Sequence, residues 1–348
     1  MSYFRENIEK LEGYLPGFQP RDADVIKINT NENPYPPSPA ALEAIRNYPA
    51  EKLRRYPEPL ADTFREVAAG VLGVGPGNII CTNGGDDLLT ICFRAFCDER
   101  AAVAYPVETY SLYSVLAKLQ NCKAIEIPFD SEYELPERLA DTGAALTIVC
   151  NPNAPSGSFI SVDKLASLAG KLSGALLVDE AYVDFAKDNC IRLIEEFENI
   201  VILRSMSKGY SLAGLRFGFG IASGEIIAGL MKVKDSYNVD AIAIAAATAA
   251  IGDQEYFKSN IEKIITERIR LTEELRKLDF SVQDSETNFV MVQCNECDAG
   301  NIYEKLAGQN IYVRYWDSSQ LKDKLRITIG TTEQNDKLIE ALKEIMPQ

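Results

Sequence analysis

The sequence of 348 residues contains no histidine. Histidine is the side chain whose charge ordinarily changes between about pH 5 and 8, and it is the base of Ser-His-Asp and Cys-His catalytic sites. Its absence excludes those mechanisms and every metal site built on imidazole. Acid–base catalysis near neutral pH must therefore come from a lysine, a carboxylate, a tyrosine or a bound cofactor.

Long apolar runs and an excess of positive charge are also absent. The longest nearly apolar segment, residues 241–251, is too short to span a bilayer, and residues 1–10 are too polar for a signal peptide. A net charge of −15 argues against a surface that binds nucleic acid or an anionic membrane. Local positive charge should therefore mark the site of an anionic ligand.

The eight cysteines do not form a disulfide framework of the kind found in small secreted domains. Reduced thiols fit the sequence best, so we expect a cytoplasmic protein. Cys294 and Cys297 form a CxxC pair, which can bind a metal or undergo redox chemistry, but no second pair follows at zinc spacing. We therefore predict no metal site and leave the role of this pair open.

Short apolar segments alternate with helical segments over most of the chain. Such alternation predicts an α/β fold with a mainly parallel central sheet flanked by helices. With 46% apolar residues, the chain is long enough for a large domain and a smaller one. The strands expected in the large sheet are residues 79–81, 101–105, 124–127, 146–150, 176–179, 200–203 and 217–222.

The character of the sequence changes near residue 253. A long charged helix is predicted for residues 254–278, followed by strands at 281–292 and 325–329 and a closing helix at 333–345. We predict an N-terminal arm at 1–29, a large ligand-binding domain at 30–252 and a small C-terminal α/β domain at 253–348. Ligands of α/β sheets bind at the carboxyl ends of the strands, where the polar clusters of this chain fall.

The polar cluster after residues 200–203 contains a lysine, two hydroxyls and an arginine. Ser205, Ser207 and Lys208 follow the predicted strand, and Arg216 lies in a glycine-rich turn shortly after them. A lysine alone after a strand is usually solvated, but a desolvated one can attack an aldehyde. Hydroxyls and an arginine suit a phosphate dianion. Pyridoxal 5′-phosphate (PLP) carries both an aldehyde and a phosphate.

Three further strand ends, after residues 79–81, 146–150 and 176–179, carry residues that suit the same cofactor. Gly84, Gly85 and Asp86 form a turn at a helix start, where backbone N–H groups can bind an anion. Asp179 ends another strand, and a carboxylate can hold a pyridine nitrogen protonated, which makes the ring an electron sink. Each cluster is weak alone, but their order and placement together favour a PLP site.

The chain resembles fold-type I, class I/II PLP-dependent aminotransferases, specifically the histidinol-phosphate aminotransferase family. The resemblance extends from Asn31 to Gly330. The motifs that carry it are Asn31-Glu-Asn-Pro-Tyr35, Arg55-Tyr-Pro-Glu58, Asn83-Gly-Gly-Asp-Asp87, Asp179-Glu-Ala-Tyr182, Ser205-Met-Ser-Lys208 with Arg216, and Val313-Arg-Tyr315 with Leu325-Arg-Ile-Thr328.

The resemblance implies a role for each matching residue. Lys208 would form the Schiff base, Asp179 would pair with the pyridine nitrogen, and Tyr182 would bond the ring hydroxyl. Tyr110 would stack on the ring, and Tyr56 would reach the cofactor phosphate from a second subunit, which implies a homodimer. The implied phosphate cradle comprises Gly84, Gly85, Ser205, Ser207 and Arg216, with Asp86 as a further cofactor-binding residue. The implied substrate contacts are Asn33, Tyr35, Arg314 and Arg326.

Two positions depart from the pattern of the family. The asparagine that usually precedes proline in Asn-Asn-Pro-Thr-Gly is Ala154 here, so either Asn153 replaces it as a cofactor ligand or the contact is absent. The proline that usually precedes Thr-Tyr is Glu108, which we expect to alter only the local loop.

The resemblance implies an enzyme that transfers an amino group between L-histidinol phosphate and 2-oxoglutarate in histidine biosynthesis. An aromatic amino-acid aminotransferase or a threonine-phosphate decarboxylase on the same fold stays open, because phosphate-binding arginines suit several substrates. A non-catalytic PLP-binding regulator is a remote alternative, since such a protein needs an added DNA-binding module and a basic face. The expected partners are a second copy of the chain, an amino donor and a 2-oxo acid.

Overall fold

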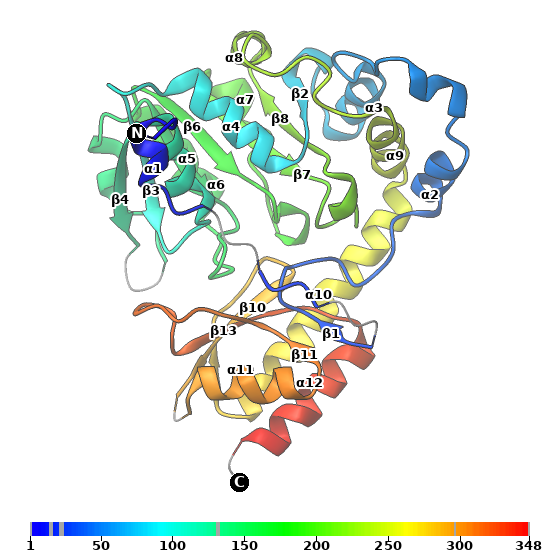
Figure 1. Cartoon of the computed structure of the whole chain (residues 1–348), viewed down its shortest axis with the longest axis vertical. Helices are drawn as coiled ribbons and strands as arrows, with labels where there is room; N and C mark the ends of the chain where they lie inside the picture. Colours follow the sequence, from blue (N-terminus) through cyan, green and yellow to red (C-terminus); the bar gives the residue numbers. More distant parts are fainter. Residues whose placement is uncertain (1, 14–16, 21–23, 130–132, 296, 347–348) are drawn as a thin grey trace.

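The computed structural model describes residues 2–13, 17–20, 24–129, 133–295 and 297–346. Figure 1 shows a larger lobe above a smaller one, with the long helix α10 (Gln254–Lys277) running from the first to the second. Within the described residues, none of the helices combines the length and the apolar character needed to cross a membrane.

A seven-stranded sheet forms the centre of the larger lobe. Strand β8 is antiparallel to both of its neighbours, and the remaining neighbours are parallel to each other. The predicted mainly parallel α/β sheet is therefore confirmed. Its strands, in spatial order, are β2 (Ile79–Thr82), β8 (Gly218–Ala222), β7 (Ile200–Ser205), β6 (Ala175–Asp179), β5 (Leu146–Cys150), β3 (Ala102–Val107) and β4 (Lys123–Pro128).

Helices cover both faces of this sheet, which explains why β5 and β6 are buried along their whole length and mostly apolar. Alternate residues of β6 enter different cores: Leu176 and Val178 lie in one, and Leu177 in the other. The first core contains side chains of α2 (Pro39–Arg46), α3 (Asp62–Leu72), α6 (Val162–Lys171) and α9 (Ala241–Gly252). The second contains side chains of α4 (Gly85–Phe96), α5 (Leu112–Gln120) and α8 (Gly224–Met231).

The smaller lobe is built on a four-stranded antiparallel sheet with its own apolar core. In spatial order its strands are β12 (Arg314–Tyr315), β13 (Lys324–Thr328), β10 (Phe289–Cys294) and β9 (Phe280–Val282). Helices α10, α11 (Ala299–Gly308) and α12 (Thr332–Ile345) contribute to this core. Two short helices, α1 (Glu6–Glu9) and α7 (Leu193–Glu196), complete the α-helices of the described residues.

The single strand predicted at 281–292 is wrong, because the structure has two antiparallel strands, β9 and β10, in its place. The hydroxyls of Ser285 and Thr287 both donate to the carbonyl of Phe289, at 2.6 and 3.0 Å. Such local side-chain hydrogen bonds compete with a strand ladder. The chain therefore turns between the two strands instead of extending through.

The domain boundaries at 30–252 and 253–348 stay a proposal. The break between α9, which ends at Gly252, and α10, which begins at Gln254, supports them. Part of the predicted arm, residues 1–29, lies outside the described residues. Its last part pairs with the smaller lobe, because β1 (Ile26–Lys27) lies parallel to β11 (Ile311–Tyr312).

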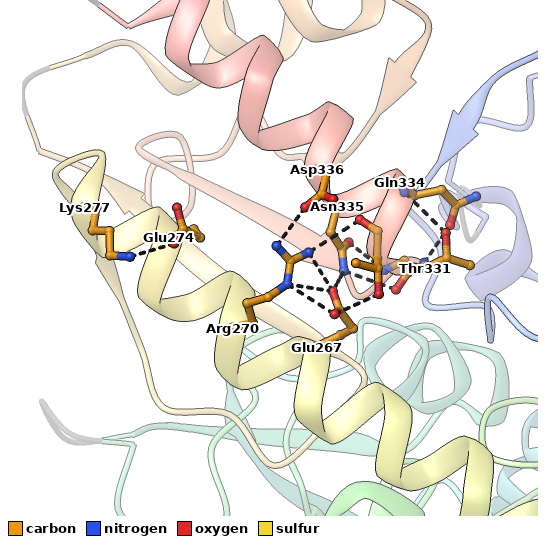
Figure 2. A network of polar contacts seen from close by, with 10 residues as sticks. Glu267, Arg270, Glu274, Lys277, Thr331, Gln334, Asn335 and Asp336 are labelled. Carbon is orange, nitrogen blue, oxygen red and sulfur yellow. Dashed lines mark hydrogen bonds and ion pairs between the residues drawn. The ribbon is translucent and has the colours of Figure 1, made fainter.

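A buried carboxylate fastens α12 to α10 inside the smaller lobe (Figure 2). Glu267 accepts hydrogen bonds from Arg270 at 2.8 Å, Asn335 at 2.9 Å and Thr332 at 3.0 Å. Arg270 also pairs with Asp336 at 2.7 Å, so one arginine contacts a carboxylate on each helix. Burial opposes ionisation of Glu267, but these donors outweigh it and lower the pKa of the carboxyl.

We predict that Glu267→Gln lowers Tm by about 2–6 °C, because the lost charge-assisted hydrogen bonds are worth roughly 1–3 kcal/mol. A group with a lowered pKa stabilises the fold at neutral pH, and this contribution is lost as pH falls through that pKa. The Tm gap should therefore shrink in acid. Thermal unfolding of Glu274→Gln is the control, since Glu274 lies on the same helix and pairs only with Lys277 in Figure 2. Equal Tm shifts in Glu267→Gln and Glu274→Gln would contradict the stabilising role of Glu267.

Candidate active site

A cavity of about 530 Å³ lies where the carboxyl ends of β3, β5, β6 and β7 face the strands β12 and β13. Strands of a parallel sheet end at one edge, so side chains far apart in the sequence meet here. The predicted site residues that line the cavity are Gly85, Asp86, Tyr110, Asp179, Tyr182, Ser205, Ser207, Lys208, Arg216, Arg314 and Arg326.

Lys208 follows β7 and directs its amine into the cavity lining. The Nζ atom donates to the carbonyl of Thr30 at 3.3 Å and lies 5.6 Å from the centre of the Tyr182 ring. Burial, together with the positive charge of Arg326, lowers the pKa of Lys208 from 10.5 to about 8. A useful fraction of the amine is therefore neutral, and nucleophilic, near physiological pH.

The main chain around Lys208 is held by Asn33. The amide Nδ2 of Asn33 donates to the carbonyls of Lys208 and Gly209, at 3.0 and 3.1 Å. Its Oδ1 accepts from the backbone N–H of Tyr35 at 3.0 Å. Asn33 was expected to contact substrate, but the structure places it against the lysine loop and not in the cavity lining.

Asp179, the last residue of β6, is 3% exposed. Its carboxylate accepts from the Tyr113 hydroxyl at 2.6 Å and from the backbone N–H of Ala181 at 3.1 Å. Burial raises the pKa of Asp179 to about 6, against the opposing effect of these hydrogen bonds. A cationic group placed beside this carboxylate would hold it ionised, because opposite charges favour the charged form.

The hydroxyl of Tyr182 is oriented by Asn31, whose Nδ2 donates to it at 2.9 Å. Asn31 is itself fixed by the smaller lobe: Thr328 bonds both its N–H and its side chain at 3.0 Å, and Asn288 bonds its carbonyl at 3.0 Å. Burial raises the pKa of Tyr182 to about 12, with Arg326 and Asn31 opposing. The hydroxyl is therefore protonated, and its own hydrogen is available to an acceptor.

One end of the cavity forms a cradle that suits a phosphate. Gly84 has φ of 86°, and a Cβ on it would lie 2.7 Å from Nη2 of Arg216, so a side chain here would strain the backbone and displace the Arg216 guanidinium. Gly85 begins α4, whose first N–H groups and dipole favour an anion. Arg216 pairs with Asp86 at 3.6 Å, and Ser205 and Ser207 add hydroxyls nearby. These residues therefore fit the phosphate of a cofactor.

The opposite end of the cavity carries two arginines of the smaller lobe. Arg314 on β12 and Arg326 on β13 are direct cross-strand partners, and both line the cavity. Nη2 of Arg326 donates to the carbonyl of Asn29 at 3.1 Å. A ligand that fills the cavity would thus meet positive charge from both lobes, together with Lys208 and Asp179.

Five predicted site residues do not line the cavity: Asn33, Tyr35, Tyr56, Gly84 and Asn153. Tyr35 packs beside α10, where Nζ of Lys263 lies 5.1 Å from its ring centre. Tyr56 is 80% exposed and stacks on Tyr237 at 4.6 Å between ring centres. Gly84 packs against the guanidinium of Arg216, which itself lines the cavity.

The departure at Ala154 has a clear structural consequence. Ala154 lines the cavity, whereas Asn153 is fully buried behind it. Asn153 accepts from Thr109 at 2.8 Å and donates to the carbonyl of Glu108 at 3.0 Å, so it braces the loop after β3. The geometry favours the reading in which the asparagine contact is absent. Glu108, expected to affect only that loop, has φ of 62° and also lines the cavity.

Sequence reasoning assigned no role to several residues of the site. Tyr113 lies in the first turn of α5 and looks like an apolar core position in the sequence, which hides its bond to Asp179. Asn31 belongs to the Asn31–Tyr35 motif, but its contact with Tyr182 joins residues 151 positions apart in the chain, which no local pattern reveals. Trp316, the single tryptophan of the chain, also lines the cavity.

Comparison with known proteins agrees with this geometry. The family model for "Aminotransferase class I and II" matches residues 23–342. The chain is 48% identical to histidinol-phosphate aminotransferase 1 of Trichormus variabilis over 99% of both chains, and 43% identical to histidinol-phosphate aminotransferase of Geotalea uraniireducens over 98% of this chain and 99% of the relative.

A solved structure of similar fold is the histidinol-phosphate aminotransferase of Sinorhizobium meliloti in complex with pyridoxal-5′-phosphate. Its TM-score is 0.90 at 27% identity, with 99% of this chain and 98% of that chain covered. The chain therefore belongs to the class I and II aminotransferases and, among them, to the histidinol-phosphate aminotransferase family.

Proposed function

We propose that this protein is a PLP-dependent aminotransferase that transfers the amino group between L-histidinol phosphate and 2-oxoglutarate, a step of histidine biosynthesis. The observation that carries the proposal is the arrangement of one cavity. A lysine with a lowered pKa and a buried carboxylate line the same cavity as arginines from both lobes. Relatives of 41–48% identity over nearly the full length bear the same enzyme name.

The residues at the first end would hold the cofactor. The Gly84–Gly85 turn, Ser205, Ser207 and Arg216 would bind its phosphate, and Asp179 would face its ring nitrogen. Tyr182 would donate to its ring oxygen, and Tyr110 would lie against its ring. When bound, pyridoxal phosphate supplies an electron sink that stabilises negative charge on the carbon of the amino donor.

Each residue between the two ends has a chemical task that follows from its surroundings. Asp179 would stay ionised beside a protonated ring nitrogen, because the cation offsets the cost of burial. The Tyr113 hydroxyl would hold that carboxylate in place. Lys208 has a pKa lowered to about 8 and lies in the cavity, so its Nζ would move the proton at the donor carbon.

Arg314 and Arg326 would bind the anionic group of the substrate at the second end. A guanidinium binds phosphate and carboxylate in the same two-pronged geometry, so one pair can serve both the phosphorylated donor and the 2-oxo acid. A threonine-phosphate decarboxylase from Porphyromonas gingivalis is also similar in structure, but its 21% identity indicates the fold alone.

The assignment predicts a strong preference among donors. Wild-type holoenzyme should transfer the amino group of L-histidinol phosphate to 2-oxoglutarate with kcat/KM at least about 10²-fold higher than with phenylalanine or threonine phosphate. Lys208→Ala should keep its fold and lose nearly all turnover with every donor. Steady-state kinetics with the three donors measure this. A higher kcat/KM for phenylalanine, or release of CO₂ from threonine phosphate, would replace the proposed substrate.

The lowered pKa of Lys208 predicts a pH dependence of cofactor capture. Only the neutral amine attacks an aldehyde, so the rate at which cofactor-free protein captures PLP should rise about tenfold per pH unit below pH 8 and level off above about pH 9. Stopped-flow absorbance measures the rate, and butylamine in place of protein corrects for ionisation of the cofactor. Arg326→Leu should move the midpoint upward, since it removes a nearby positive charge. A midpoint above 10 in wild type would contradict the prediction.

We further propose that the protein is a cytoplasmic homodimer. All eight cysteines are free thiols, which fits a reducing compartment. Tyr56 and Tyr237 are stacked on each other, are 80% and 41% exposed, and lie outside the cavity of their own chain. Leu53 and Leu60, near Tyr56 in the chain, are exposed as well. A second copy of the chain would cover these apolar side chains and bring Tyr56 to the neighbouring cofactor.

Shared active sites predict complementation between inactive variants. Lys208→Ala loses its own amine, and Tyr56→Ala loses its contribution to the partner's site. A mixed dimer then contains one site with both changes and one intact site. Random reassociation should restore up to about a quarter of wild-type activity. Activity and native mass spectrometry of the mixture measure the result. Mixed dimers that form without regaining activity would exclude a shared site.

A further inference from the structure

The two arginines at the substrate end form an arrangement that is unfavourable by itself. Arg314 and Arg326 are direct cross-strand partners on β12 and β13. Like charges in directly opposite positions of a sheet repel each other. In the part of the chain that the structure describes, Arg314 makes no ion pair with a carboxylate. A separate interaction must therefore keep its guanidinium beside that of Arg326.

Trp316 supplies this interaction. The guanidinium carbons of Arg314 and Arg326 lie 5.0 and 5.2 Å from the centre of its ring. Both are within the range of a cation–π interaction, for which tryptophan is the best aromatic partner. Trp316 is partly buried, and it lines the cavity together with both arginines.

The two arginines depend on Trp316 to different degrees. Arg326 also lies 5.1 Å from the ring of Phe289 and donates to the carbonyl of Asn29 at 3.1 Å, so it is fixed from several sides. Arg314 has the Trp316 ring as its aromatic contact. Loss of the ring should therefore release Arg314 and leave Arg326 in place.

We propose that Trp316 is a positioning residue that holds Arg314 beside Arg326 and thereby gives the site its preference for a phosphate dianion over a carboxylate. A carboxylate has two oxygens and is satisfied by one guanidinium, whereas a phosphate dianion has more acceptor oxygens and twice the charge, so it gains from the second guanidinium. The inference rests on the proposed function for the identity of the phosphorylated donor.

Inorganic phosphate and acetate are probes of this preference that require no turnover. Calorimetry and competitive inhibition use the holoenzyme at constant ionic strength, so that the cofactor occupies its own phosphate cradle. Trp316→Leu should weaken phosphate binding about tenfold and acetate binding less than about twofold. Trp316→Phe, which keeps an aromatic face, should stay within about threefold of wild type for both anions. Equal phosphate affinity in wild type and Trp316→Leu would overturn the inference.

Kinetics and a double-mutant cycle separate this role from a structural one. Trp316→Leu should raise KM for the phosphorylated donor about tenfold while kcat stays within about twofold. Arg314→Leu with Trp316→Leu should bind phosphate no more weakly than Arg314→Leu alone, because both changes act through one guanidinium. Independent, additive losses would contradict the mechanism. Tyr315→Leu is the matched control, since Tyr315 stacks on Tyr303 at 5.7 Å outside the cavity lining.

Trp316 is the single tryptophan of the chain, so its fluorescence reports directly on this site. Phosphate should change the tryptophan emission of the wild-type holoenzyme, and it should change the emission of Arg314→Leu much less. If calorimetry detects phosphate binding without a change in emission, the anion binds elsewhere and the inference is overturned. If Trp316→Leu does not fold, Trp316→Met takes its place in every comparison. If histidinol phosphate proves not to be the amino donor, the anion measurements still test the role of Trp316. If the enzyme turns over histidinol phosphate but its affinity for phosphate does not depend on Trp316, only this inference is rejected.

Discussion

Burial of ionisable groups at one edge of the sheet is the constraint on which the site depends. The same withdrawal from water lowers the pKa of Lys208 and raises that of Asp179. Each group is held by a neutral partner, Lys208 by the carbonyl of Thr30 and Asp179 by the hydroxyl of Tyr113. The protein thus keeps an amine that is readily neutral and a carboxylate that is readily ionised by a cation, which are the properties that a pyridine aldehyde requires.

The smaller lobe completes this edge, because the groups that orient the site come from both lobes. Asn31 connects the Tyr182 hydroxyl of the larger lobe to Thr328 and Asn288 of the smaller one. The lysine loop is held by Asn33, two residues further along the same segment. A segment near the N-terminus therefore couples the positions of Lys208 and Tyr182 to the position of the smaller lobe.

Charge is distributed unevenly in a way that suits the proposed ligands. The chain carries a net charge of −15, yet arginines occupy both ends of the cavity. Arg216 lies at the cradle formed by Gly84 and Gly85, and Arg314 and Arg326 lie at the other end. Positive potential concentrated in a concave site attracts anions that the rest of the surface repels. A phosphorylated cofactor and a phosphorylated substrate can therefore both be bound by a strongly acidic protein.

The sequence by itself determined the type of fold and most of the chemistry. Short apolar strands that alternate with helices predict a mainly parallel sheet. Helices connect parallel strands and cover both faces of the sheet, so the strands appear in the sequence as continuous apolar runs. The polar residues that follow those strands, such as Asp179 and Lys208, must then meet at one edge, which made their grouping predictable. The absence of histidine removed the competing mechanisms.

Tertiary structure decided which groups support that chemistry. Tyr113 looks like an ordinary core residue, and only the packing of α5 on the sheet places its hydroxyl 2.6 Å from Asp179. Whether Asn153 or Ala154 faces the cavity depends on side-chain direction within one loop, which motif spacing does not specify. The contact of Trp316 with two arginines arises from strand pairing between β12 and β13. These features rest on contacts between distant segments, and a pattern of neighbouring residues carries no information about them.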